Sequence, residues 1–170
     1  FEMGMRQLGG HALYIGPEEV KLGKRETAGD VARTLSRYTH GIMARVYAHS
    51  DIVELARHAS VPVINGLSDT EHPCQALADV MTIMERFGDL RGVNVAFIGD
   101  ANNVARSLVY AVTMLGGHIV LGTPPGYQLP ADAAARAEAY AKQTGGSMVQ
   151  IANPASAVED ADVIYTDVWV

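Results

Sequence analysis

Short apolar runs alternate with segments of helical periodicity along most of this 170-residue chain. In the second half the apolar runs lie at residues 93–98, 119–122, 148–151 and 163–166, and the helical patterns between them at 104–115, 131–144 and 155–159. Strands separated by helices of this length pair in parallel, and such crossovers are right-handed in nearly all cases. The alternation therefore predicts an α/β fold built from parallel sheets.

The first half shows the same alternation with shorter strands. The expected strands are 11–15, 42–47 and 61–64, and the expected helices are 1–8, 28–38, 51–57 and 73–87. A charged loop is expected at 18–25, and Thr27 can cap the helix that follows it. The glycines of the segment 88–92 separate the two halves. We therefore expect two βαβ domains, residues 1–87 and 88–170, of which the second is doubly wound and Rossmann-like.

Composition excludes several classes of partner. A hydrophobic content of 48% is enough for a sizeable core, whereas a formal net charge of −6 argues against nucleic acid or an anionic membrane surface as the main partner. No apolar run approaches the ~20 residues that span a membrane. The single cysteine permits no internal disulfide, which favours a reducing compartment. These features predict a cytoplasmic protein.

The segment 71–75, Glu-His-Pro-Cys-Gln, joins a polar loop to the helix expected at 73–87. Pro73 fits the first turn of that helix, where its missing N–H costs no hydrogen bond. His72 and Gln75 then lie at a helix N-terminus, where free amides and the helix dipole favour an anion or a polarised carbonyl oxygen. The pair predicts a carbonyl-recognition site, and the alternative is a His-Pro pair that only caps the helix.

Three further residues follow or interrupt predicted strands, at the edge where open α/β sheets bind ligands. Arg45 lies in the strand 42–47, Asn103 ends the segment Gly99-Asp100-Ala101-Asn102-Asn103, and Asp167 follows the last strand. Each has a plainer interpretation: an exposed edge-strand charge, a helix cap and a loop acid, respectively. The Gly99 segment does not match a dinucleotide fingerprint, because Ala101 and Val104 stand where that motif has its second and third glycines.

The histidines and the cysteine do not predict a metal site. The six histidines form no helical i,i+4 pair and have no cysteine at ligand spacing. Cys74 is expected to be a packing residue, since no base and orienting group for a nucleophile can be identified near it.

Taken together, the motifs occur in the order and spacing of a known family. They are Phe1-Glu2, Arg45, His72-Pro73-Cys74-Gln75, Gly99-Asp100-Ala101-Asn102-Asn103 and Thr166-Asp167-Val168-Trp169-Val170. Over its whole length the chain resembles the ornithine carbamoyltransferases of the aspartate/ornithine carbamoyltransferase family. The resemblance implies transfer of a carbamoyl group from carbamoyl phosphate to the δ-amine of L-ornithine, without a cofactor, by a homo-oligomer that is a trimer or a multiple of trimers.

The resemblance also assigns roles to residues. Arg45 and His72 would be the catalytic residues that hold the carbamoyl oxygen, and Gln75 would orient the carbamoyl NH2 group of carbamoyl phosphate. Asn103 and Asp167 would bind the amino-acid end of ornithine. Lys21 stands where many members have a glutamine that reaches a neighbouring subunit's phosphate site, and it could serve the same anion as a point charge.

The chain departs from the family pattern at both ends. It begins without an initiator methionine, inside an expected helix, and the family's Ser-x-Arg-Thr-Arg, Ser-Met-Gly and His-Cys-Leu-Pro motifs are missing. We therefore expect a central fragment that is inactive by itself. The alternatives are a carbamoyltransferase for putrescine, acetylornithine or aspartate, or a non-catalytic nucleotide-binding module. The sequence does not distinguish a role in arginine synthesis from one in arginine breakdown.

Overall fold

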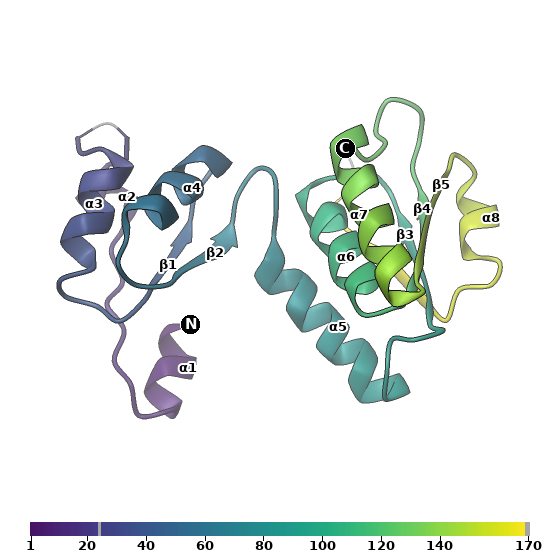
Figure 1. Cartoon of the computed structure of the whole chain (residues 1–170), viewed down its shortest axis with the longest axis horizontal. Coiled ribbons are helices and arrows are strands. Elements are labelled where there is room, and N and C mark those ends of the chain that lie inside the picture. Colours follow the sequence, from purple (N-terminus) through teal and green to yellow (C-terminus); the bar gives the residue numbers. More distant parts are fainter. Residues whose placement is uncertain (24, 169–170) are drawn as a thin grey trace. The chain divides into compact units, whose positions relative to one another are not determined.

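The computed structural model describes residues 1–23 and 25–168 (Figure 1). Contacts between residues divide this part of the chain into two compact units. The first comprises Phe1–Met43 and Ser50–Ile64, and the second comprises Ala44–His49 together with the chain from Asn65 onward. Arg45, His72, Gln75, Asn103 and Asp167 therefore all fall in the second unit.

The N-terminal elements end with the strand that leads into the second unit. They are α1 (Glu2–Gln7), α2 (Pro17–Val20), α3 (Ala28–Leu35), β1 (Ile42–Arg45), α4 (His49–His58) and β2 (Val63–Leu67). β1 and β2 form a two-stranded sheet. The two strands run in the same direction, since Ile42 N–H donates to Pro62 O and Val46 N–H donates to Leu67 O, both at 2.9 Å.

Local side-chain chemistry accounts for two of these helices. Thr27 caps α3 as expected, because its Oγ1 accepts a hydrogen bond from Asp30 N–H at 3.1 Å. Part of the charged loop expected at 18–25 instead belongs to α2, which begins with Pro17. The N–H of Gly16, the residue before this helix, donates to the Glu19 carboxylate. The cap and the proline suffice to start a single helical turn.

The strand expected at 11–15 does not form. These residues have no ladder partner in the described chain, and Leu13 and Tyr14 remain 70% and 81% exposed. An apolar run with strand propensity becomes a strand only when a neighbouring strand takes its backbone hydrogen bonds, so the sequence pattern alone was insufficient here.

The second unit contains the parallel, doubly wound sheet that the sequence predicts. Its elements are α5 (Pro73–Phe87), β3 (Asn94–Ile98), α6 (Asn103–Met114), β4 (His118–Gly122), α7 (Ala131–Thr144), β5 (Ser147–Ile151), α8 (Pro154–Val158) and β6 (Val163–Thr166). The strand order is β5-β4-β3-β6, with every pair parallel. Helices α5, α6 and α7 lie on one side of this sheet and α8 on the other (Figure 1).

The order of strands fixes where this sheet can bind a ligand. The chain moves outward from β3 through β4 to β5 and then returns to the other side of β3 with β6. β3 and β6 therefore flank the point at which the strand order reverses, and open α/β sheets bind ligands at the carboxyl ends of such strands. The Gly99–Asn103 segment and Asp167 follow these strands.

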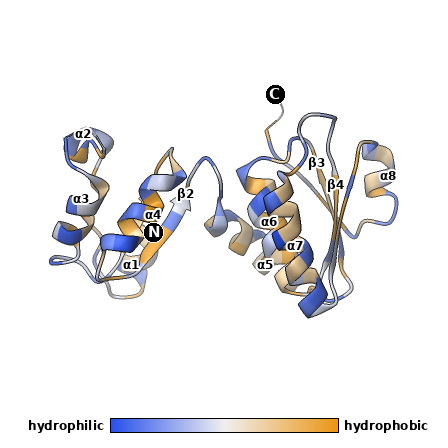
Figure 2. Ribbon diagram, turned by 45° about the horizontal axis from the view of Figure 1, so that its top comes forward, coloured by the Kyte–Doolittle hydropathy of each residue, from blue (hydrophilic) through white to orange (hydrophobic). Residues whose placement is uncertain are grey.

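The core of the second unit lies between the sheet and α5 to α7. Val95, Ala96 and Phe97 are all fully buried, as expected for a central strand covered on both faces. From α5, Val80 and Ile83 join the same cluster as Leu108 of α6, and Figure 2 shows hydrophobic colour on both helices. Burial of each large apolar side chain contributes roughly 1.5–3 kcal/mol. None of the described helices is both long and apolar enough to cross a membrane.

Candidate active site

Ser68 is the centre of the loop between β2 and α5. It is fully buried, and its Oγ lies 2.9 Å from His49 Nδ1, 3.2 Å from Glu71 N and 3.3 Å from Asn65 Nδ2. Ser68 N–H also donates to Glu71 O at 2.9 Å, which closes the turn. These contacts fix the backbone that leads into His72. The sequence pattern gives no indication of this role, because the partners come from α4, β2 and the loop itself, and His49 lies 19 positions away in the chain.

His72 is the N-cap residue of α5, but its side chain does not act as a cap. The backbone N–H of His72 donates to Ser107 Oγ on α6 at 2.8 Å. The imidazole Nδ1 is buried and has no hydrogen-bond partner among the described residues. The imidazole therefore does not cap the helix, and a buried nitrogen without a partner is uncommon in folded proteins.

Gln75 lies in the first turn of α5, and its side chain is held by a residue of the same helix. Its Nε2 donates to Asp79 Oδ1 at 2.9 Å. Burial, and after it the negative charge of Asp79, raise the pKa of Tyr165 on β6 to about 12. The carboxamide expected to contact carbamoyl phosphate is therefore part of a polar cluster contributed by α5 and β6.

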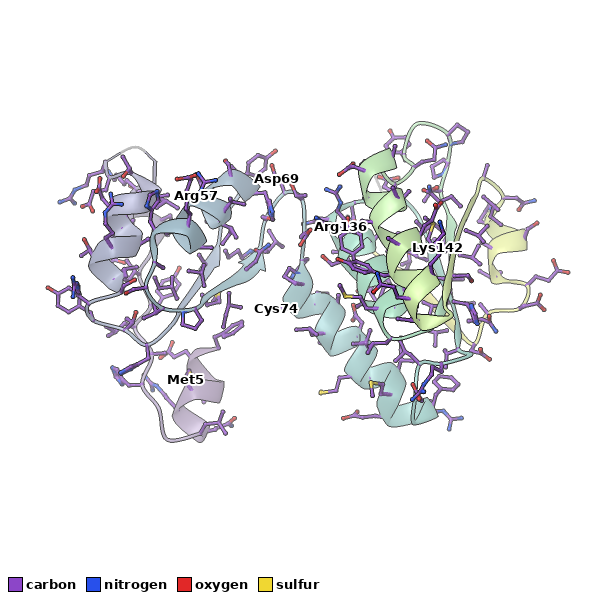
Figure 3. The ribbon with its side chains drawn as sticks, viewed as in Figure 1. Met5, Arg57, Asp69, Cys74, Arg136 and Lys142 are labelled. Carbon is purple, nitrogen blue, oxygen red and sulfur yellow. The ribbon has the colours of Figure 1, made fainter. Side chains whose placement is uncertain are left out.

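Cys74, for which the sequence predicts a packing role, is half-buried. Its Sγ donates to Asn65 O at 3.2 Å, which ties the first turn of α5 to the middle of β2. Figure 3 labels Cys74 on this turn and Asp69 on the preceding loop. Asp69 supports the same loop, since its Oδ1 accepts from His49 N–H at 3.0 Å.

Asn102 connects the segments that follow β3 and β6. Its Oδ1 caps α6 by accepting from Val104 N–H and Ala105 N–H at 3.0 and 3.1 Å. Its Nδ2 donates to Asp167 Oδ2 at 2.8 Å. One carboxamide thus starts α6 after β3 and also holds the carboxylate that follows β6. The plain capping interpretation accounts for only half of what this asparagine does.

Asn103 connects α6 to the loop that precedes α5. Its Nδ2 donates to Ser68 O at 2.7 Å. The sequence motif predicted that Asn103 lies at a helix start, and α6 does begin there. The contact with Ser68 joins residues 35 positions apart, so it could be found only in the folded chain.

Arg45 and Lys21 are the two cationic candidates. Arg45 ends β1 with an exposed side chain, which is compatible both with an anion or carbonyl ligand and with an exposed edge-strand charge. Lys21 has a left-handed backbone with φ of 48° and pairs with Glu18 at 3.4 Å, both side chains being largely exposed. Within residues 1–23 and 25–168, no group of three or more histidine, cysteine, aspartate or glutamate side chains could hold a metal ion.

Two family models together match nearly the whole chain. The model described as aspartate/ornithine carbamoyltransferase, carbamoyl-P binding domain, matches residues 1–85. The model described as aspartate/ornithine carbamoyltransferase, Asp/Orn binding domain, matches residues 91–170. The chain belongs to the aspartate/ornithine carbamoyltransferase family.

Within this family, the similar proteins include several ornithine carbamoyltransferases. That of Pyrococcus horikoshii is 55% identical over 99% of this chain and 53% of its own length. The structure of the Pyrococcus furiosus enzyme superposes with a TM-score of 0.97 at 54% identity, over 99% of this chain and 54% of that one. An N-acetyl-L-ornithine transcarbamylase mutant, complexed with PALAO, is 30% identical with a TM-score of 0.87, over 99% of this chain and 60% of that one.

This chain spans about half the length of the ornithine carbamoyltransferases that it matches. The motif Asp167-Val168-Trp169-Val170 is only partly visible in the structure, because its last two residues lie outside the described residues.

Proposed function

We propose that the protein containing this chain is an ornithine carbamoyltransferase, which converts carbamoyl phosphate and L-ornithine to L-citrulline and phosphate. The buried, unpaired His72 Nδ1 at the start of α5 is the structural observation that carries the proposal. Ornithine is favoured over acetylornithine because the ornithine carbamoyltransferase of Pyrococcus horikoshii is 55% identical and the acetylornithine enzyme 30%.

In the reaction, the δ-amine of ornithine attacks the carbamoyl carbon and phosphate leaves. Negative charge develops on the carbamoyl oxygen, and donors already aimed at that oxygen lower the barrier without reorganising. Arg45 and His72 supply these donors, while the N-terminus of α5 adds the positive end of its dipole. Gln75 orients the carbamoyl NH2 group.

Asn103 and Asp167 hold the amino-acid end of ornithine. The Asp167 Oδ2 atom is engaged by Asn102 at 2.8 Å, which leaves the other carboxylate oxygen for the α-amine. Fixing ornithine and carbamoyl phosphate in one site makes a two-substrate encounter effectively intramolecular. No step of this reaction requires a cofactor.

Partners and location complete the proposal. The protein works in the cytoplasm as a homo-oligomer, a trimer or a multiple of trimers. The domains comprise residues 1–87 and 88–170, as proposed from the sequence. The product citrulline links the reaction to arginine metabolism, and the Pyrococcus furiosus relative is described as anabolic.

Substitution of the two catalytic donors tests the proposal. In the complete protein, Arg45→Ala and His72→Ala should each lower turnover by roughly a hundredfold or more, as for loss of an oxyanion donor. Arg37→Ala, which removes another exposed arginine, should leave turnover unchanged. Near-normal turnover in either donor variant would remove that residue from the site. Binding of a nicotinamide or adenine nucleotide in place of carbamoyl phosphate would support the nucleotide-binding alternative.

A further inference from the structure

The side chain of Gln75 has only one favourable orientation beside Asp79. The two residues are four apart on α5, and the amide nitrogen of Gln75 lies 2.9 Å from Asp79 Oδ1. An ionised carboxylate can only accept hydrogen bonds, so it must face the NH2 end of a carboxamide and not its oxygen. Rotation of the Gln75 amide by 180° would place two acceptors against each other. Asp79 therefore selects one of two otherwise similar orientations.

Tyr165 of β6 is electrostatically coupled to the same pair. Burial raises the pKa of Tyr165 to about 12, the negative charge of Asp79 adds to the rise, and the Gln75 side chain opposes it. Because the NH2 end of Gln75 is held by Asp79, its oxygen is at the opposite end of the amide.

Asp79 also has an unusual environment for a residue with only a structural role. Its Oδ2 is buried and lacks a hydrogen-bond partner of normal geometry among the described residues. A buried carboxylate oxygen without a partner is destabilising, and native structures contain few such groups. The presence of Asp79 one helical turn after Gln75 is explained if the fixed carboxamide is needed for binding.

We propose that Asp79 is a positioning residue that presents the Gln75 oxygen to the bound substrate, so that the site selects an N–H donor at that place. This inference rests on the proposed function and extends it to substrate selection. Carbamoyl phosphate carries an NH2 group where acetyl phosphate carries a methyl group, and the two molecules otherwise share the carbonyl and the phosphate. Only the first can donate to a fixed acceptor.

The wild-type complete protein provides the first test. It should bind acetyl phosphate, measured as a competitor of carbamoyl phosphate, about ten- to a hundredfold more weakly, because the methyl group leaves a desolvated acceptor unpaired. Equal affinity for the two would overturn the inference without any substitution. Failure to bind carbamoyl phosphate at all would overturn both the inference and the proposed function, whereas binding without discrimination would overturn the inference alone.

Asp79→Asn provides the second test. Asparagine has nearly the same shape as aspartate but can donate as well as accept, so the Gln75 amide can rotate by 180° and keep a hydrogen bond. The KM for carbamoyl phosphate should rise about tenfold and the preference over acetyl phosphate should fall about tenfold, while inhibition by inorganic phosphate stays unchanged.

Glu85→Gln is the matched control, since it neutralises an exposed carboxylate on the same helix. It should keep the wild-type preference. A merely structural Asp79 would lower activity without changing the ratio of the two affinities. An Asp79→Asn variant with the wild-type ratio would therefore refute the positioning role.

Discussion

Replacement of Asn102 by alanine removes two interactions through one side chain. Loss of an asparagine cap costs about 1 kcal/mol, and here the cap accepts from Val104 N–H and Ala105 N–H. Loss of a hydrogen bond to a carboxylate costs about 1–2 kcal/mol more when that group is half-buried, as Asp167 is. Asn102→Ala should therefore destabilise the protein by about 2–3 kcal/mol.

Two variants separate these contributions. Asn153 caps α8 in the same way, accepting from Ala155 N–H and Ser156 N–H at 2.9 and 3.5 Å, and it is exposed. Asn153→Ala should therefore cost about 1 kcal/mol or less. Asn102→Asp keeps an acceptor for the helix amides but places a second carboxylate against Asp167, so the cap survives while the attraction becomes repulsion.

Equilibrium unfolding in urea, followed by circular dichroism, measures these differences. A double-mutant cycle with Asp167→Ala should give a coupling of about 1 kcal/mol between Asn102 and Asp167. If Asn102→Ala cost no more than Asn153→Ala, or if the cycle gave no coupling, the reasoning that one carboxamide links the two strands would be refuted.

The remaining predictions concern Tyr165 and Asp167. Ultraviolet titration of the seven tyrosines should show one late component, with a pKa of about 12, which Tyr165→Phe removes and Asp79→Asn moves downward. The folded-state pKa of Tyr165 is raised from 10, so its contribution to stability is complete below pH 10 and is lost as the pH rises through about 12. Wild type should accordingly lose more stability than Tyr165→Phe over this range, and parallel curves would contradict the assignment. In the complete protein, Asp167→Ala should weaken ornithine binding far more than carbamoyl phosphate binding in separate titrations, and an equal loss would argue against separate roles.

Helices with strong local patterns were predictable to the residue. The bounds 73–87 and 131–144 match α5 and α7, because Pro73 marks the first turn of one and glycines 88 and 145 end both in conformations with positive φ. The prediction of a strand at 11–15 was wrong for the opposite reason. Its local pattern was adequate, but a strand also needs a partner, and the chain near it supplies none in the described residues.

The site residues were predictable as types and positions, but their contacts were not. The family motifs identify Gln75 and Asp167, yet the partners of Asn102 and Asn103 lie 65 and 35 positions away. Asp79 is different, because a carboxylate four residues after a glutamine on a helix is a pairing that spacing alone indicates. Ser68 could not be found in this way, since nothing in a polar loop distinguishes the one buried hydroxyl.

The position of β6 beside β3 has a consequence for the order of folding. β3, β4 and β5 pair in chain order, whereas β6 crosses back to pair Val95 with Val163. Closing so long a loop is entropically unfavourable, and pairings of this kind form slowly. On a ribosome, moreover, β6 is the last of these strands to emerge. We therefore expect a nascent chain to assemble the hydrophobic centre of this unit first, and to bring Asp167 beside Asn102 only in the final step.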